Sequence, residues 1–319
     1  MTITNQLNAK GSCSLSSENF ISDRAIQKLI IDKDIKFFLS SPESIAIRQQ
    51  RDAKDPSVHP SELCRFTKGG VSYDPNRPDA DFPTYIDPRF LNYSANQLPC
   101  GYFVCEGPDP INLSHYLRFI KEVCLNKNPA ITDILVVGSP DEGARFRDYF
   151  SADNKVDGQL HITSKELQAS DTIKKYELTI YLVKENISKV ITVHQITQMP
   201  DHNSATLTRN DIGYLYSLAS SINPANLVAH CAAGIGRSPS VIFSFILFRE
   251  YRSVFSGFDA EVFQKIWLKL TQIRQIRPGA IQTAEQLKQA MQLAVEYKMI
   301  DWEKNPEHLR DDLGFASII

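Results

Sequence analysis

Apolar residues along this chain form short runs that alternate with helical patterns from about residue 90 onward. Runs typical of buried or half-buried strands occur at 90–94, 102–105, 134–137, 176–183, 188–196 and 227–229. Apolar residues recur at helical spacing within 113–124, 210–222, 241–248, 262–273 and 287–295. From these elements we expect one α/β domain, built on a twisted, mostly mixed β-sheet that is flanked by helices.

The two ends of the chain differ from this central part. Residues 1–20 are polar and rich in serine and asparagine, which predicts a flexible tail. Residues 21–60 are expected to be a helical N-terminal segment, with Ser22 as one helix cap and Pro42 in the first turn of a second helix. The main domain then covers 61–298, and residues 299–319 are expected to be a C-terminal tail.

Composition narrows the class of protein. A hydrophobic content of 42% and a charged content of 23% are ordinary for a globular protein, and a formal net charge of −2 gives no reason to expect nucleic acid as a partner. No apolar run reaches about 18 residues, so no membrane span is expected. The six cysteines are far apart and form no Cys-x-x-Cys pair. We therefore expect free thiols, a reducing cytoplasmic compartment and no metal site or other cofactor.

The strongest candidate for chemistry is the stretch His-Cys-Ala-Ala-Gly-Ile-Gly-Arg-Ser at residues 230–238. It lies between the apolar runs 227–229 and 241–248, which predicts a buried strand, a tight glycine loop and a buried helix. A loop that leads into a helix N-terminus is a typical anion site, because its amide groups and the helix dipole favour negative charge. A thiolate at Cys231 would be stabilised there, and the guanidinium of Arg237 fits two oxygens of a phosphate.

This stretch resembles the phosphate-binding loop of the protein tyrosine phosphatases, and the phosphotyrosine-specific branch most closely. Further motifs of that family follow in the same order along residues 61–298. They are Asn92-Tyr93-Ser94, then Glu106-Gly107-Pro108, then Met199-Pro200-Asp201-His202, and finally Gln282-Thr283 with Gln286. The chain departs from the family where Tyr93 replaces Ala, Glu106 replaces Gln, Met199 replaces Trp and Ala232 replaces Ser.

The resemblance implies a set of catalytic roles. Cys231 would be the nucleophile, Arg237 would hold the phosphate, and Asp201 would act as general acid and then as general base. Gln282 would orient the hydrolytic water. Ser238 would stabilise the departing thiolate, and His230 would hold the loop through hydrogen bonds.

The resemblance also implies substrate-binding residues. The phosphate would lie against the loop residues Ala232, Ala233, Gly234, Ile235 and Gly236, and Gln286 would contribute from the start of the last helix, where it also fits a capping box with Thr283. Phe66 would form an aromatic wall against the substrate ring, with Tyr73 as the competing candidate. Asp141 or Glu142 would pair with Arg237, and the sequence does not choose between them.

The function expected from these residues is hydrolysis of phosphotyrosine in proteins through a phosphocysteine intermediate. The alternatives are a pseudophosphatase that binds phosphotyrosine without turnover, and a phosphatase for phosphoserine, phosphothreonine or phosphoinositides. No lysine lies within 232–236, which favours a singly phosphorylated aromatic ester over a highly charged inositol head. The divergent loops are compatible with a bacterial phosphatase that is secreted into a host cell, and equally with an unusual intracellular enzyme. The sequence makes no prediction about the oligomeric state.

Overall fold

The computed structural model describes residues 95–98, 100–108, 131–139, 149–150, 154–156, 160–167, 170–183, 186–200, 204–250, 260–277 and 280–308. Several predictions lie outside these residues. They are the tail at 1–20, the helical segment at 21–60, the helix at 113–124, and the candidates Phe66, Tyr73, Asp141, Glu142 and Asp201.

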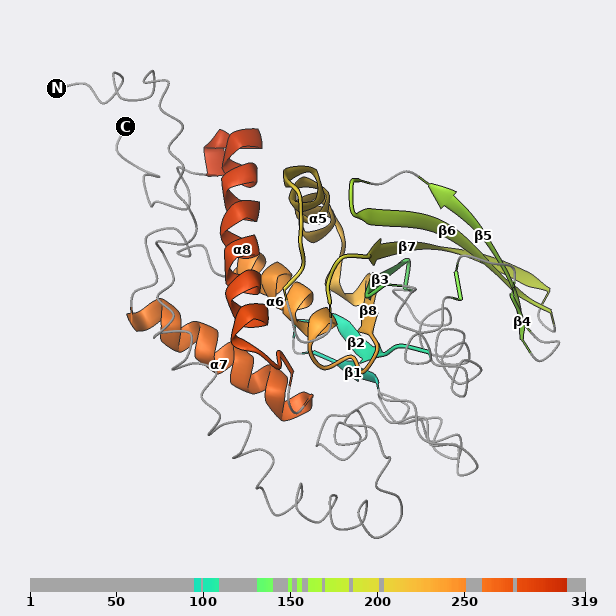
Figure 1. Cartoon of the computed structure of the whole chain (residues 1–319), viewed down its shortest axis with the longest axis horizontal. Coiled ribbons are helices and arrows are strands. Elements are labelled where there is room, and N and C mark those ends of the chain that lie inside the picture. Colours follow the sequence, from blue (N-terminus) through green and yellow to red (C-terminus); the bar gives the residue numbers. More distant parts are fainter. Residues whose placement is uncertain are drawn as a thin grey trace, which may run out of the picture.

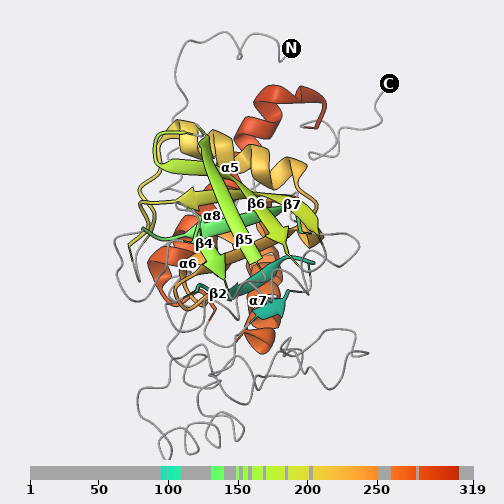
Figure 2. The ribbon, with the colours of Figure 1, turned by 90° about the vertical axis from the view of Figure 1, so that its right-hand side faces the viewer.

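The described strands form one mixed sheet of eight strands, in the order β1-β2-β8-β3-β7-β6-β5-β4 (Figures 1 and 2). The central strands β2, β8, β3 and β7 are parallel to one another, and every other neighbouring pair is antiparallel. The strands are β1 (Ala95–Gln97), β2 (Phe103–Glu106), β3 (Asp133–Val137), β4 (Asn154–Val156), β5 (Leu160–Leu167), β6 (Ile173–Leu182), β7 (Ile187–Ile196) and β8 (Leu227–Cys231). The prediction of a mixed sheet is confirmed.

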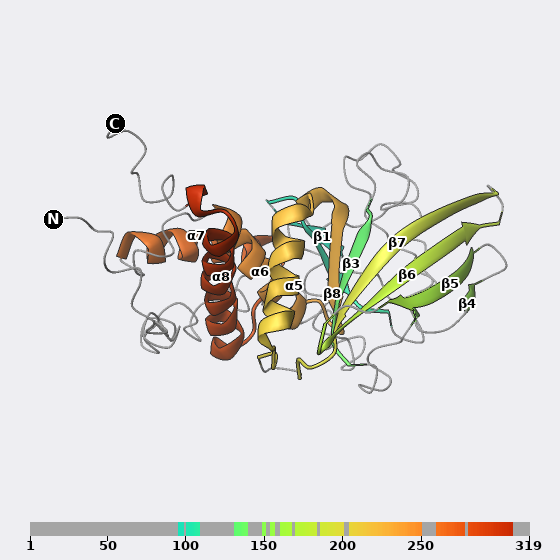
Figure 3. The same ribbon diagram turned by 90° about the horizontal axis from the view of Figure 1, so that it is seen from above.

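Four described α-helices lie on one side of this sheet (Figure 3). They are α5 (Arg209–Ser221), α6 (Arg237–Glu250), α7 (Ala260–Ile276) and α8 (Ala284–Lys304), and a short 3-10 helix, η6 (Pro224–Asn226), precedes β8. Thr208 caps α5 in a capping box with Asp211, and Thr283 caps α8 in a capping box with Gln286. The capping box predicted at 283–286 is therefore confirmed. None of the described helices is long and apolar enough to cross a membrane.

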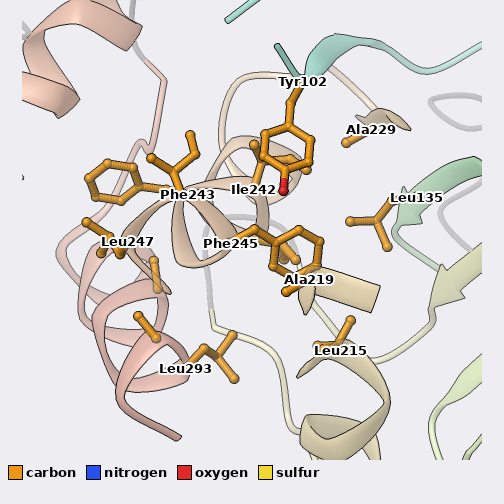
Figure 4. Close-up of a cluster of buried hydrophobic side chains, with 14 of the residues drawn as sticks. Tyr102, Leu135, Leu215, Ala219, Ala229, Ile242, Phe243, Phe245, Leu247 and Leu293 are labelled. Atoms are coloured by element: carbon orange, nitrogen blue, oxygen red, sulfur yellow. The ribbon is translucent and has the colours of Figure 1, made fainter. Parts of the chain in front are cut away.

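Helix α6 is the centre of the packing. Every residue from Arg237 to Phe248 is buried, because α6 contacts β8 and β3 on one side and α8 on the other. A helix that is apolar on all sides is stable only in such a position. Figure 4 shows Phe243, Phe245 and Leu247 of α6 among buried side chains from the sheet, α5 and α8.

The sheet separates two apolar clusters, and β8 contributes to both. Leu227, Ala229 and Cys231 belong to the cluster on the α6 side, and Val228 belongs to the cluster on the other face. Side chains alternate between the two faces of a strand, so Cys231 points to the helical side. Cys231 is also the last residue of a parallel strand, and functional sites of such sheets lie at this carboxyl edge.

Two expectations about the elements need correction. Strand β5 was not predicted, because it carries Thr163, Ser164, Lys165 and Glu166 and buries few side chains. The C-terminal tail was expected to begin at 299, but α8 continues to Lys304. The extra turn is held by Asp301, which accepts a hydrogen bond of 2.9 Å from the Tyr216 hydroxyl on α5.

The central position of α6 predicts that Phe245 is costly to truncate. Its ring lies 6.2 Å from that of Tyr102 and 6.0 Å from that of Tyr297, and its side chain is fully buried. Phe245→Ala should lower the free energy of unfolding by about 3–5 kcal/mol, because it leaves a cavity. Urea unfolding measures this loss. Leu268→Ala on α7, at a residue that is 60% exposed, is the control and should stay within about 0.5 kcal/mol of wild type.

Candidate active site

The loop from Cys231 to Arg237 joins β8 to α6, and two of its glycines are required by close packing. Gly234 has a φ of +64°, and a Cβ built there would lie 2.0 Å from the Cys105 carbonyl oxygen. A Cβ at Gly236 would lie 2.4 Å from Oε1 of Gln282. The loop therefore lies between the end of β2 and the start of α8. Only glycine fits at Gly234, whereas a side chain at Gly236 would displace the Gln282 and Gln286 amide groups.

The Cys231 sulfur lies at the centre of this loop, and its residue is 2% exposed. It accepts hydrogen bonds from the Gly234 amide at 3.2 Å and from the Ser238 hydroxyl at 3.4 Å. One donor comes from the middle of the loop and the other from the first turn of α6, and both are favourable to a negative charge on sulfur. Figure 1 shows this turn between β8 and α6.

Donors from outside bind the carbonyl groups of the loop one after another. The Gly107 amide donates to Ala232 O at 2.9 Å, and the Ile281 amide donates to Ile235 O at 2.8 Å. Between them, Arg277 donates to Ala233 O at 2.9 Å and also to Gly234 O. Four consecutive carbonyl groups are thus held facing away from the cysteine.

Arg277 is a residue that the sequence analysis did not single out. It is fully buried, and its third hydrogen bond goes to Oδ1 of Asn96 at 2.6 Å. Its only signal in the sequence is an arginine near the end of a helix, which is common because a basic side chain suits the helix dipole there. The pairing with the loop appears only once the fold brings α7 and β1 beside it.

Arg237 is the first residue of α6 and is 1% exposed. Its Nη1 donates to the Met199 carbonyl at 3.3 Å, which connects the cysteine loop with the segment that follows β7. The structure therefore places the predicted phosphate-binding arginine beside the motif that contains Asp201. The carboxylate expected to pair with Arg237, Asp141 or Glu142, lies outside the described residues.

His230 lies on the sheet face opposite Cys231. It is fully buried, and its Nε2 and the Tyr149 hydroxyl are 3.1 Å apart. Burial lowers the pKa of the His230 imidazole to about 3, although a hydrogen bond to the Cys231 backbone acts in the opposite direction. The imidazole is therefore neutral near pH 7. A neutral, buried ring that is hydrogen-bonded to the Cys231 backbone supports a structural role for His230.

The start of α8 completes the described part of the site. Gln286 is fully buried, and its Oε1 accepts from the Gln282 amide at 2.9 Å and the Thr283 amide at 3.4 Å. A Cβ at Gly236 would lie 2.9 Å from Nε2 of Gln286, so this amide group also faces the loop. The structure thus brings Gln282 and Gln286 together beside Gly236 of the loop.

Most of the residues selected from the sequence converge at one place. Those that the structure brings together are His230, Cys231, Ala232, Ala233, Gly234, Ile235, Gly236, Arg237, Ser238, Gln282 and Gln286. Among the described residues there is no group of three or more His, Cys, Asp or Glu side chains arranged to hold a metal ion. The described part of the site offers the Cys231 thiol, the Arg237 guanidinium, the Ser238 hydroxyl and backbone amides.

A family model described as protein-tyrosine phosphatase matches residues 54–296. The chain belongs to the protein-tyrosine phosphatase family. The resemblance recognised in the cysteine loop is thus confirmed over most of the chain.

Two curated members of the family are similar in sequence. Tyrosine-protein phosphatase non-receptor type 20 of Mus musculus is 24% identical over 215 residues, which cover 66% of this chain and 48% of the mouse protein. Tyrosine-protein phosphatase 2 of Dictyostelium discoideum is 23% identical over 146 residues, which cover 46% of this chain and 38% of that protein. The chain spans about half or less of these curated relatives.

Solved structures of PTPN18 share the fold. One PTPN18 structure, solved to explain its fingerprint on distinct HER2 tyrosine phosphorylation sites, matches with a TM-score of 0.60 and 18% identity. The match covers 86% of this chain and 95% of the PTPN18 chain. A complex of PTPN18 with HER2 phosphopeptides matches with a TM-score of 0.57 and 19% identity, covering 90% of this chain and 94% of that one. At this level of identity, the likeness establishes the architecture of the protein tyrosine phosphatases for this chain.

The buried contacts of Arg277 predict a large loss of stability when its guanidinium is removed. Arg277→Met leaves the carbonyl groups of Ala233 and Gly234 and the Asn96 side chain without these donors, so unfolding should become easier by about 3 kcal/mol or more. Binding of inorganic phosphate should weaken as well, since the loop loses its outer support. Urea unfolding and phosphate inhibition measure the two effects.

A matched control for this variant is Arg209→Met. The Arg209 side chain is 88% exposed and pairs with Glu303 at 3.8 Å, and such surface pairs contribute only about 0–1 kcal/mol. Equal losses for the two arginine variants would show that the contacts of Arg277 do not support the loop.

The low pKa of His230 predicts a dependence of stability on pH. The unfolded chain protonates this histidine near pH 6.5, whereas the folded state resists protonation down to about pH 3. Stability is therefore fully present above about pH 6.5 and is lost as the pH falls towards 3, by about 2 kcal/mol at pH 5. Between about pH 7 and pH 5, His230→Gln should not lose the part of the unfolding free energy that wild type loses through protonation of His230. If its urea-unfolding curves shift with pH as much as those of wild type, the assignment is wrong.

Proposed function

We propose that this protein hydrolyses phosphotyrosine esters through a phosphocysteine intermediate. The observation that carries the proposal is the Cys231 sulfur, which accepts two hydrogen bonds at the centre of a loop that leads into a helix N-terminus beginning with Arg237. Amides and a guanidinium in this arrangement fit the equatorial oxygens of a phosphoryl group, where charge gathers during transfer. A sulfur nucleophile, a cradle for the phosphate and a helix dipole are thus present in one loop.

In the first step, the Cys231 thiolate attacks phosphorus, the S–P bond forms and the bond from phosphorus to the tyrosine oxygen breaks. Arg237 and the loop amides hold the phosphoryl oxygens. Asp201, two residues after Met199 in the chain, donates a proton to the leaving oxygen. The contact between Arg237 and the Met199 carbonyl supports this assignment, because it keeps the motif that contains the acid beside the phosphate site.

In the second step, water attacks the phosphocysteine and the S–P bond breaks. Asp201 accepts a proton from this water, and Gln282 orients the water from the start of α8. The Ser238 hydroxyl, 3.4 Å from the sulfur, stabilises the thiolate as it departs. The closeness of the Gln282 side chain to Gly236 supports its part in this step.

Phosphotyrosine in proteins is the substrate class that we propose. The loop residues 232–236 carry no charged side chain, which suits a single phosphate better than a polyphosphorylated inositol. The curated relatives are named tyrosine-protein phosphatases, and PTPN18 has been solved in complex with phosphopeptides. Phe66 is proposed as the wall against the tyrosine ring.

Turnover of phosphotyrosine peptides by three variants tests this mechanism. Cys231→Ser should release no phosphate yet still bind peptide, and Asp201→Ala should slow turnover by roughly 10²-fold or more. Cys100→Ser is the control, because burial raises the pKa of this thiol to about 11 and keeps it protonated. It should turn over substrate like wild type.

Two results would contradict the proposal in different ways. Peptide binding by wild type without any phosphate release would identify a pseudophosphatase. Release from phosphoserine peptides or phosphoinositides, but not from phosphotyrosine, would move the substrate class and leave the cysteine chemistry in place.

A further inference from the structure

The segment between β7 and α5 contains the proposed general acid, and its two arms are joined at the base. The Thr206 amide donates to the Gln198 carbonyl at 2.9 Å. Met199 and Ala205 are the first residues inside this closure, one on each arm, and Asp201 lies between them in the sequence. We call the side of the segment that begins at Met199 the outgoing arm, and the side that ends at Ala205 the returning arm.

The arm that returns to α5 is held by one side chain of α8. The Ala205 amide donates to Oε1 of Gln289 at 2.7 Å, and Nε2 of Gln289 donates to the Ala205 carbonyl at 2.6 Å. Both groups of one glutamine amide thus bind both backbone groups of one residue. Ala205 is 9% exposed, so water does not readily replace these bonds.

The outgoing arm is held by the phosphate site itself. Met199 is 1% exposed, and its carbonyl accepts from Nη1 of Arg237 at 3.3 Å. One arm is thus tied to the arginine at the start of α6, and the other is tied to α8. Met199 precedes Asp201 in the chain and Ala205 follows it, so these hydrogen bonds act on both sides of the proposed acid.

Helix α8 carries both Gln289, which binds Ala205, and Gln286, which lies beside the cysteine loop. Gln286 faces the loop from the first turn of α8, and Gln289 lies three residues further, on a neighbouring position of the same helix face. One rigid helix therefore contacts both the phosphate cradle and the arm that returns from the acid. A fixed distance between an acid and the group that it protonates is what general acid catalysis requires.

We propose that Gln289 is a positioning residue for the general acid: its paired hydrogen bonds with Ala205 fix the arm that follows Asp201 in the chain to the helix that also contacts the phosphate cradle. This inference rests on the proposed function, in which Asp201 protonates the leaving oxygen. Gln289 touches no reacting atom and acts through the backbone of Ala205. Its effect is specific to the step in which a proton is transferred.

The experiment compares two aryl phosphates that differ in their need for an acid. Phenyl phosphate has a poor leaving group and needs a proton donor, whereas 2,4-dinitrophenyl phosphate has a good leaving group and needs little help. Gln289→Leu keeps a side chain of comparable volume and removes both hydrogen bonds. It should lower kcat/KM, which reports formation of the phosphocysteine, about 10-fold for phenyl phosphate, less than complete loss of the acid. It should leave kcat/KM for the dinitrophenyl ester and inhibition by inorganic phosphate within about twofold.

Two further variants show through which group Gln289 acts. In Asp201→Asn the acid is already absent, so adding Gln289→Leu should cost no further activity. Gln292→Leu, at a partly exposed glutamine of the same helix, is the matched control and should match wild type on both esters. Gln289→Glu keeps an acceptor for the Ala205 amide and loses the donor, so it should show a smaller loss on phenyl phosphate alone.

The outcomes separate the two proposals. Equal losses on both esters in Gln289→Leu, or a further loss when it is added to Asp201→Asn, would overturn the positioning role. If Gln289→Leu does not fold, the same criteria apply to Gln289→Glu. If Asp201→Asn lowers kcat/KM equally for both esters, the acid assignment itself fails, whatever Gln289 does.

Discussion

The site depends on how the carbonyl groups of the cysteine loop are bound. A loop that turns its amides towards one point must turn its carbonyl groups outward, and buried carbonyl groups need donors. Here the donors come from three separate elements: the Gly107 amide after β2, the Arg277 side chain at the end of α7, and the Ile281 amide before α8. Strand β2 pairs with β8 in the sheet, and α8 packs on α6. The geometry at the sulfur is therefore a consequence of the whole α/β packing rather than of the loop alone.

The close approach of these elements explains why small residues surround the loop. A Cβ at Gly107 would lie 2.4 Å from the Cys231 carbonyl oxygen, and one at Gly234 would lie within 2.6 Å of Arg277. Backbone-to-backbone contacts of this kind leave no room for side chains, and the positive φ of Gly234 is unfavourable for other residues as well. The glycines thus allow β2, the loop and the end of α7 to share one small volume.

Features that are local in the sequence could be predicted, and features that join distant segments could not. The strand, loop and helix around Cys231 are continuous in the chain, and so is the capping box of Thr283 and Gln286. By contrast, Arg277 and Asn96 are 181 residues apart, and Gln289 and Ala205 are 84 apart. An arginine or glutamine on an amphipathic helix has the same pattern whether it faces solvent or another segment, so only the fold shows which partner it has. The same limit applies to β5. Its polar residues give no apolar pattern from which a strand could be predicted, yet β5 pairs along its whole length with β6.

The replacement of the family tryptophan by Met199 can be understood from the way this position is used. The polar contact with Arg237 is made by the Met199 carbonyl, and a backbone group does not depend on the identity of the side chain. The side chain itself is buried in the apolar cluster on the α6 side, where a flexible thioether packs without leaving a polar atom unpaired. A smaller side chain gives up packing area on the outgoing arm. On the other side of this motif, the paired hydrogen bonds between Gln289 and Ala205 also involve backbone groups, so the contacts at Met199 and at Ala205 are both independent of the side chains at these two positions.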